Sequence, residues 1–284
     1  MIKIITIADI HYGKNTLTKR GDTALSLLDE FNLFVDNEKP DFIVDLGDRI
    51  NDVDKKNDIN LQKKIFKKLN ENKIKTYHIC GNHDVVNLSI SENEDIFNQS
   101  LENEVILLNN YKIILWRADT KIYHTDNFRG FKINEMDFIW LNTEVINSKV
   151  PVIIFSHVPI SPASLIGNYY FQNNPSFGSY PNSSRLRNSL CKASMPVFFL
   201  SGHVHWNSFA QEDGITYLTQ QSLTESFSNY GKPAKSWGQI SLDNKFLWKV
   251  YGDEPIEISL DIKKRNSITP LGSFSNLNQD LRAK

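Results

Sequence analysis

Cysteine is scarce in this sequence. Only Cys80 and Cys191 occur among the 284 residues, and they stand far apart along the chain. Two isolated cysteines exclude a disulfide framework of the kind that stabilises small secreted domains, and they lack the spacing of a cysteine-based zinc site. The composition therefore agrees with a reducing compartment.

Long hydrophobic runs are also missing from the sequence. The longest apolar stretches, such as VPVIIF at 150–155, are much shorter than the roughly 20 residues that cross a bilayer. The sequence begins with a strand-like run and shows no separate hydrophobic region of a signal peptide. We therefore expect a cytoplasmic protein that does not insert into a membrane.

Neither sign of charge is in excess. The 32 Lys and Arg residues nearly balance the 33 Asp and Glu residues, which gives a formal net charge of −1. A groove that follows a nucleic-acid backbone needs an excess of positive charge, so the composition disfavours nucleic acid as a partner. We expect a small molecule as the ligand, and nothing in the sequence indicates an oligomeric state.

The apolar content is sufficient for one large core. Hydrophobic residues make up 40% of the chain, and no low-complexity segment or internal repeat interrupts it. We predict a single domain over residues 1–262 with a lid-like loop at about 158–192. The polar, turn-rich tail at 263–284 is expected to wrap the surface or fray.

Five runs of apolar, β-branched residues predict strands that are buried on both faces, because their hydrophobicity is continuous rather than alternating. They lie at 2–9, 41–48, 75–82, 151–157 and 196–203. Apolar residues at helical spacing predict helices at about 24–35, 61–69 and 136–146, the last with Asn134 as its N-cap, and 111–119 is expected to form an extra strand. After residue 205, short runs between turn residues predict an antiparallel sheet. The order of elements indicates an α/β fold.

Potential metal ligands stand at the end of each of the five predicted strands. In chain order they are Asp9, His11, Asp48, Asn82, His83, Asp84, His157, His203 and His205. Because the carboxyl ends of parallel strands meet at one edge of a sheet, we expect these side chains to converge. Residues two apart in an extended chain point to opposite faces, so the Asp-x-His and His-x-His pairs should lie on turns, aided by the neighbouring glycines 13, 47, 81 and 202.

The chemistry of this set favours a metal centre. A carboxylate can bridge two cations, imidazole suits zinc, iron and manganese, and an amide oxygen adds a neutral ligand. Taken alone, each residue has a more ordinary explanation, such as an Asx turn at Asp9 or a structural role for His157. The ordered set has enough donors for two ions.

The motifs DIH, GD, GNHD, SH and GHVH resemble, in this order, the calcineurin-like metallophosphoesterases, whose pattern is D-x-H, GD, GNH[DE], H and GHxH. The resemblance extends from Asp9 to His205. Their spacing is similar to that of the class containing small bacterial cyclic-nucleotide phosphodiesterases and glycerophosphodiesterases. The runs YHICGNHDVVNLSISE and FSHVPISP also look like those of members that cleave ADP-ribose and CDP-alcohols, although those proteins often carry Gln where His11 stands here.

The resemblance implies a four-layer αββα sandwich with two mixed sheets flanked by helices. It also implies two divalent or trivalent ions of iron, manganese or zinc, and a metal-bridging hydroxide that attacks phosphorus. One ion would be held by Asp9, His11 and His205, the other by Asn82, His157 and His203, and Asp48 would bridge the two.

Further roles follow from the same resemblance. His83 becomes the candidate general acid or electrostatic stabiliser, and Asn82 a neighbouring catalytic and substrate-binding residue. Asp84 would orient His83 or a nearby backbone amide. Independently of the resemblance, the position of Arg49 directly after Asp48 would let it either bind the substrate phosphate or pair with a surface carboxylate such as Asp52.

The segment 158–192 is expected to act as a lid or binding loop because it is too long for a plain connection. Its aromatic residues could stack on a base, and its arginines could bind a second phosphate. Alternatively, the rings simply pack the segment onto the body. The residues concerned are Tyr169, Tyr170, Phe171, Phe177, Tyr180, Arg185 and Arg187.

The sequence thus favours a two-metal phosphoesterase that acts on small phosphomonoesters or phosphodiesters, with nucleotide-like substrates preferred. A pyrophosphatase of nucleoside diphosphate derivatives is the nearest alternative. A nuclease would need a basic groove to bind the nucleic-acid backbone, and the charge balance disfavours such a groove. A non-catalytic binding scaffold of the same fold would be expected to have lost metal ligands, and here every ligand position is filled.

Overall fold

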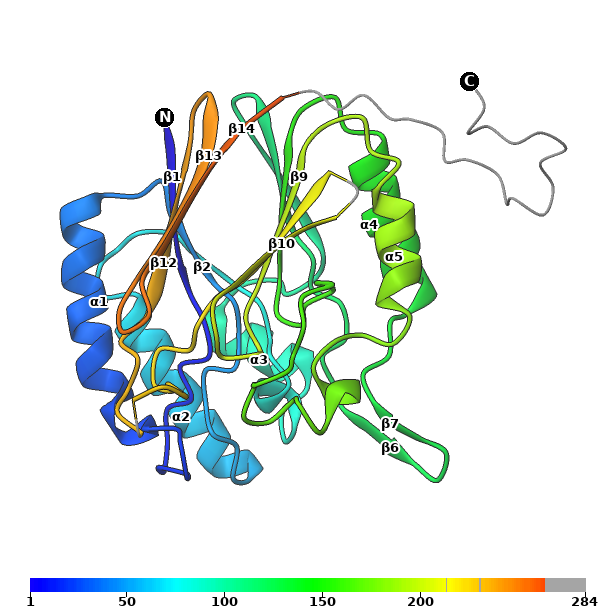
Figure 1. The fold of residues 1–284 in the computed structure, drawn as a ribbon. Helices are drawn as coiled ribbons and strands as arrows, with labels where there is room; N and C mark the ends of the chain where they lie inside the picture. The colour runs from blue at the N-terminus through cyan, green and yellow to red at the C-terminus, as the bar shows by residue number, and fades with distance from the viewer. Residues whose placement is uncertain (213, 230, 264–284) are drawn as a thin grey trace, which may run out of the picture.

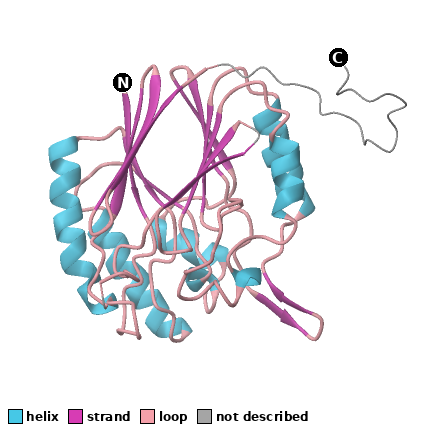
Figure 2. Cartoon of the chain, in the orientation of Figure 1, coloured by secondary structure: helices cyan, strands magenta, loops and turns pink. Residues whose placement is uncertain are grey.

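Two six-stranded mixed sheets face each other in the middle of the molecule, and helices cover both outer faces (Figures 1 and 2). The structure is a computed structural model, and it describes residues 1–212, 214–229 and 231–263. Apart from Lys263, the predicted polar tail lies outside the described residues. The arrangement confirms the predicted four-layer αββα architecture.

The first sheet combines three parallel strands with three antiparallel ones. Its order is β14 (Ile256–Asp261), β13 (Lys245–Tyr251), β12 (Trp237–Leu242), β1 (Ile2–Ile7), β2 (Phe42–Asp45) and β3 (Thr76–His78). Strands β1, β2 and β3 run parallel, whereas β12 pairs antiparallel with β1 and continues into β13 and β14. The βαβαβ order predicted for the N-terminal part is confirmed.

The second sheet is built from the middle of the chain. Its order is β10 (Ser208–Glu212), β11 (Ile215–Thr219), β9 (Val197–Ser201), β8 (Val152–Ser156), β5 (Tyr111–Leu115) and β4 (Glu104–Leu108). A two-stranded hairpin of β6 (Tyr123–Thr125) and β7 (Phe128–Gly130) projects from the body below this sheet (Figure 1).

The placement of two groups of strands corrects the sequence prediction. The five strands that carry the motifs do not share one sheet, because β1, β2 and β3 belong to the first sheet whereas β8 and β9 belong to the second. The region after residue 205 does not form one antiparallel sheet either, since β11 runs parallel to β9. A strand with apolar residues on both faces fits the interior of either sheet, so its sequence does not indicate which neighbours it has.

Helices cover the outer face of each sheet. The first sheet is covered by α1 (Ala24–Glu38) and α2 (Lys55–Leu69), and α3 (Ile90–Phe97) packs beside α2. The second sheet is covered by α4 (Glu135–Ile146) and α5 (Ser183–Leu190). The Asn134 side chain accepts a hydrogen bond from the Met136 amide, which confirms it as the N-cap of α4. None of the helices in the described part of the chain is both long and apolar enough to cross a membrane, and the cytoplasmic location stays a prediction.

Three apolar layers hold the sheets and helices together. Phe198 of β9 stacks on Phe246 of β13 with ring centroids 4.0 Å apart, so the two sheets are in direct contact. On β8, Ile153 belongs to the core between the sheets and Ile154 to the core under α4 and α5. This alternation explains the continuous hydrophobicity of the strand. Because the strand packs on both faces, the position of the loop that follows it is also fixed.

Candidate metal centre

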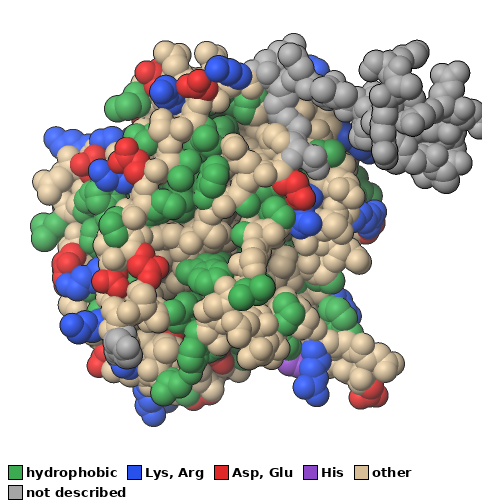
Figure 3. Space-filling view, in the orientation of Figure 1, with side chains coloured by type: hydrophobic (Ala, Val, Ile, Leu, Met, Phe, Trp, Pro, Cys, Tyr) green, Lys and Arg blue, Asp and Glu red, His purple; other side chains and the backbone are tan. Residues whose placement is uncertain are grey.

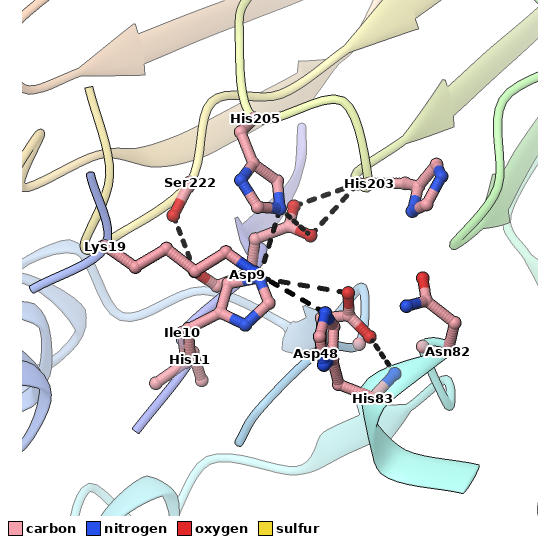
Figure 4. A network of polar contacts seen from close by, with 12 residues as sticks. Asp9, Ile10, His11, Lys19, Asp48, Asn82, His83, His203, His205 and Ser222 are labelled. Atoms are coloured by element: carbon pink, nitrogen blue, oxygen red, sulfur yellow. Dashed lines mark hydrogen bonds and ion pairs between the residues drawn. The ribbon is translucent and has the colours of Figure 1, made fainter. Parts of the chain in front are cut away.

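The predicted metal ligands lie in loops directly after β1, β2, β3, β8 and β9. Strands from both sheets end on the same side of the sandwich, so these loops meet there (Figure 4). Five donors adopt positive φ angles: 52° at Asp9, 48° at His11, 55° at Asp48, 72° at His203 and 59° at His205. The expectation that the two spaced pairs lie on turns is therefore met, and the turns form at the donors themselves.

Two glycines let these loops approach closely. A Cβ atom on Gly81 would overlap the Asp48 carboxylate, and one on Gly202 would lie 2.7 Å from Asp9 Oδ2. Neither of these positions has a positive φ angle, so the glycines serve the close approach of backbone to carboxylate rather than a left-handed turn.

The donor atoms form two clusters that share one carboxylate. Within each cluster the possible ligand atoms lie within 4.8 Å of one another. The first cluster contains Asp9, His11, Asp48 and His205, and the second contains Asp48, His157 and His203. The Asn82 side chain adjoins the second cluster, with its Oδ1 atom 3.3 Å from His157 Nε2. The structure thus brings together all seven residues that the sequence proposed as ligands.

Three of the histidines are oriented by a hydrogen bond from their other ring nitrogen. His157 Nδ1 lies 2.9 Å from the Leu46 carbonyl oxygen, His203 Nε2 lies 2.7 Å from the Phe177 carbonyl oxygen, and His205 Nδ1 contacts the Glu225 carboxylate. Because a carbonyl or carboxylate oxygen accepts the proton on this nitrogen, the opposite ring nitrogen faces the centre and can ligate a cation once it carries no proton.

The donor set fits metal ions. His203 Nδ1 is buried and has no hydrogen-bond partner among the described residues, as expected for a nitrogen that would ligate a cation. Burial works against a charge on His157, but the nearby Asp48 carboxylate outweighs it and raises the pKa of His157 to about 9. Burial and then His157 lower the pKa of His203 to about 3. The centre therefore attracts positive charge while His203 stays neutral and able to ligate.

Glu225 was not predicted from the sequence. It lies in a stretch without a recognisable motif, and only the folded chain brings its carboxylate to His205 Nδ1 and to the Tyr170 hydroxyl, which donates to Glu225 Oε1 at 3.2 Å. Burial opposes its charge, but the proximity of His205 lowers the pKa of Glu225. Glu225 therefore fixes the ring orientation of one ligand.

His83 lies at the edge of the centre, in a short 3-10 helix (His83–Val85). Its backbone amide donates to Asp48 Oδ1 at 2.8 Å, and its Nδ1 atom lies 2.5 Å from Asp52 Oδ1. This hydrogen bond lowers the pKa of Asp52. Asp52 therefore orients the His83 ring, and Nε2 is left facing the pocket beside Lys19 Nζ at 3.4 Å.

Asp84 takes up one of its two predicted roles, the orientation of a nearby backbone amide. Its carboxylate accepts hydrogen bonds from the backbone amides of Asp48, Arg49 and Gly81 at 2.9, 3.0 and 2.8 Å. It orients neighbouring amides and does not contact His83 in the structure. Asp84 thus joins the loop after β2 to the loop after β3 and holds Asp48 in place.

The prediction for Arg49 is wrong in both of its forms. Arg49 is fully buried, and its guanidinium contacts Asp45 Oδ2 at 2.7 Å and Asp84 Oδ2 at 3.1 Å. It does not line the cavity beside the donor clusters, and it does not pair with Asp52. Two interior carboxylates need a cation between them, and the side chain of Arg49 supplies it from beneath the loops.

Removing this buried cation should destabilise the fold. In Arg49→Met, both Asp45 and Asp84 lose their ionic partner, so we expect the free energy of unfolding to fall by about 3–5 kcal/mol in urea titrations of metal-free protein. Arg185→Met is the matched control, because Arg185 pairs with Glu135 on the exposed surface and its loss should leave stability nearly unchanged. Equal stability of both variants would contradict this role of Arg49.

A cavity of about 300 Å³ opens beside the two clusters. It is lined by Lys19, Asp48, Asn82, His83, Ile122, Tyr170, Phe171, Phe177, His203 and His205. The segment 158–192 therefore supplies an aromatic wall next to the metal ligands. Nothing in the sequence singled out Lys19, because it lies on a loop without motif character.

Other residues of the segment 158–192 do not line this cavity. Tyr180 is buried against Trp116, with ring centroids 5.5 Å apart, and so packs the segment onto the body. Arg185 forms its ion pair with Glu135, and Arg187 forms one with Glu212 at 2.9 Å. Both arginines thus pair with carboxylates and neither lines the cavity, which disfavours the prediction that they bind a second phosphate there.

The comparison with known families decides the identity of the chain. A sequence model described as calcineurin-like phosphoesterase matches residues 2–207. The chain belongs to the calcineurin-like phosphoesterase family. This phosphoesterase is therefore a metal-dependent hydrolase of phosphoric esters, as the motifs predicted. No curated protein sequence matches it.

Solved structures share the fold of this phosphoesterase at low sequence identity. The crystal structure of a dimetal phosphatase from Danio rerio has a TM-score of 0.73 and 16% identity, over 92% of this chain and 99% of that one. GAP50, the anchor in the inner membrane complex of Plasmodium, has a TM-score of 0.55 and 14% identity, over 93% of this chain and 90% of that one. One fold thus occurs in a phosphatase and in an anchor, so the activity has to be argued from the site.

Proposed function

We propose that this phosphoesterase holds two metal ions and hydrolyses small phosphomonoesters or phosphodiesters, with nucleotide-like substrates preferred. The observation that carries the proposal is the Asp48 carboxylate, which belongs to both donor clusters at once. A carboxylate shared in this way is what a pair of neighbouring cations requires.

The residues proposed to hold the ions are those of the two clusters together with Asn82. They are Asp9, His11 and His205 for one ion, Asn82, His157 and His203 for the other, and Asp48 for both. Bound ions would supply Lewis acidity for the phosphoryl oxygens and for the attacking water. Iron, manganese and zinc all suit this mixture of carboxylate, imidazole and amide donors.

His83 is proposed to protonate the leaving group. The Asp52 carboxylate accepts the Nδ1 proton, which holds the ring with Nε2 towards the cavity. A proton on Nε2 can pass to the departing alkoxide oxygen as its bond to phosphorus breaks. Asn82 lies beside His83 in the cavity wall and is proposed to contact the same phosphoryl group, while Asp84 keeps the two loops in position.

The cavity supports a small, ring-bearing substrate. Its volume of about 300 Å³ lies at the lower end of the range for ligand pockets, and Tyr170, Phe171 and Phe177 offer flat apolar surfaces beside the metal ligands. We propose that the segment 158–192, within a single domain over 1–262, forms this wall of the substrate site.

The structure provides less support for the alternatives. A pyrophosphate substrate would present a second phosphate, and the two arginines expected to bind it are paired elsewhere. On the described part of the face shown in Figure 3, acidic and basic side chains are interspersed and form no basic stripe of the kind a nuclease would use. A scaffold would not need seven converging donors.

A substrate panel tests the proposal. Protein of measured metal content is assayed with p-nitrophenyl phosphate and bis-p-nitrophenyl phosphate in the presence of manganese, zinc or iron. We expect metal-dependent turnover of at least one of the two esters, abolished by a chelator and restored by the ion. Protein that contains two ions per chain and hydrolyses neither ester would refute the proposed activity.

A further inference from the structure

We infer that Lys19 binds the second negative charge of a terminal phosphoryl group, so that this phosphoesterase prefers phosphomonoesters to phosphodiesters. The inference rests on the proposed function and adds a substrate class to it. Lys19 is carried by the loop between β1 and α1 and lines the same cavity as Asp48, Asn82 and His203.

The first observation is a buried lysine that forms no ion pair with a described residue. Lys19 keeps only 8% of its surface exposed. Among the residues that the structure describes, its ammonium contacts His83 Nε2 at 3.4 Å and the Tyr170 ring at 5.7 Å, and no carboxylate oxygen lies within ion-pair distance. Lysines are almost never buried to this extent unless they are paired, because desolvation of the ammonium is costly.

The neighbouring carboxylates already have partners. The charge of Lys19 contributes to the lowered pKa of Glu225, but Glu225 accepts its hydrogen bonds from His205 and Tyr170. Asp52 accepts from His83, and Asp48 lies among the proposed metal ligands. The missing counter-ion of Lys19 is therefore best supplied from the cavity. Figure 4 shows the Lys19 side chain extending over the site towards His83.

The backbone of the loop fixes this position. Lys19 forms a short antiparallel bridge with Glu225, its carbonyl accepts from the Thr16 amide at 3.0 Å, and the Arg20 amide donates to the Thr224 carbonyl at 3.1 Å. The side chain therefore starts from an anchored point beside the metal ligands. Little conformational freedom has to be lost when it meets an anion.

The charge of the substrate decides which ester benefits. A phosphomonoester carries close to two negative charges on its terminal phosphoryl group near neutral pH, because its second pKa is about 6. A phosphodiester carries one negative charge, and its second substituent occupies the place of the other charged oxygen. A fixed ammonium beyond the metal centre therefore stabilises a bound monoester more than a bound diester.

The test compares Lys19→Met with Lys14→Met, an exposed lysine on the same loop. Methionine keeps most of the apolar stem beside Tyr170 and removes only the charge. We expect kcat/KM for p-nitrophenyl phosphate to fall about 10- to 100-fold in Lys19→Met, as for the loss of one charge-assisted hydrogen bond, while bis-p-nitrophenyl phosphate changes by less than about 3-fold. Lys19→Arg should restore most of the lost activity, and Lys14→Met should behave as wild type.

Binding of inorganic phosphate gives a second measurement that does not depend on turnover. In calorimetric titrations of the metal-loaded protein, Lys19→Met should bind phosphate at least about 10-fold more weakly than wild type and Lys14→Met, because phosphate presents the same charged oxygens as a monoester. Equal losses for both esters, or unchanged phosphate binding, would overturn the inference. If wild type hydrolysed neither ester, the proposed function would fail, and the phosphate titration would still decide the role of Lys19.

Discussion

Asp48→Ala is expected to abolish metal binding at both sites of the centre. Among the residues described by the structure, Asp48 alone contributes a ligand atom to both clusters, and its Oδ2 atom lies 3.8 Å from His11 Nε2 and 3.5 Å from His157 Nε2. Without its carboxylate, both sites lose a shared anionic ligand, and the second cluster keeps only the neutral donors of His157 and His203, so a cation should bind much more weakly. Elemental analysis should find well below one ion per chain, and turnover should fall by more than about 100-fold, the upper cost of losing an outer partner of a metal ligand.

The matched control for this variant is Asp52→Asn. Asp52 is another acidic residue close to the site, but it contacts His83 and belongs to neither cluster. Its replacement removes a carboxylate without removing a proposed ligand, so the metal content should stay at the wild-type value. Full metal occupancy in Asp48→Ala would show that Asp48 does not bridge the two sites.

The second large effect is expected for His83→Ala. This variant should retain both metal ions, because the contribution of His83 to the Asp48 carboxylate is made through its backbone amide. Its kcat should nevertheless fall by about 10²- to 10⁴-fold, the usual contribution of a positioned general acid. Metal analysis and steady-state kinetics on the same preparation separate the two properties.

The choice of substrate distinguishes acid catalysis from simple electrostatic stabilisation. A phenolate stabilised by a nitro group needs little help from a proton, whereas an alkoxide leaves poorly without one. If His83 protonates the leaving group, the loss in His83→Ala should be much larger for an alkyl phosphate than for p-nitrophenyl phosphate. Equal losses for the two esters would assign His83 an electrostatic role, and wild-type turnover would remove it from the mechanism.

Much of the fold could be predicted because it depends on short-range patterns in the sequence. The amphipathic spacing of Leu28 and Phe31 reports the face of α1 that packs on the first sheet, and Asn134 marks the start of α4 through its own side chain. The metal ligands could be proposed because each of the five groups stands directly after a strand. A loop that follows a strand has little freedom, so its place along the chain largely determines its place in the fold.

The remaining features depend on contacts between distant parts of the chain. The β11 strand lies parallel to β9 because of the sheet that surrounds it, and no local pattern distinguishes this from an antiparallel hairpin. Arg49 stands beside a proposed metal ligand in the sequence, but its side chain is buried in the fold because it pairs there with the carboxylates of Asp45 and Asp84. Glu225 becomes a partner of His205 only after the loop that follows β11 crosses the site.

The left-handed backbone of the five donors limits where the thermal stability of this enzyme can be increased. A residue other than glycine in the left-handed conformation costs roughly 1–2 kcal/mol relative to ordinary backbone. The five donors in this conformation lie together at one end of the sandwich. Glycine would relieve that cost but would delete a ligand. Substitutions that raise the thermal stability of this enzyme are therefore expected in the two sheets and their helices rather than at these five positions.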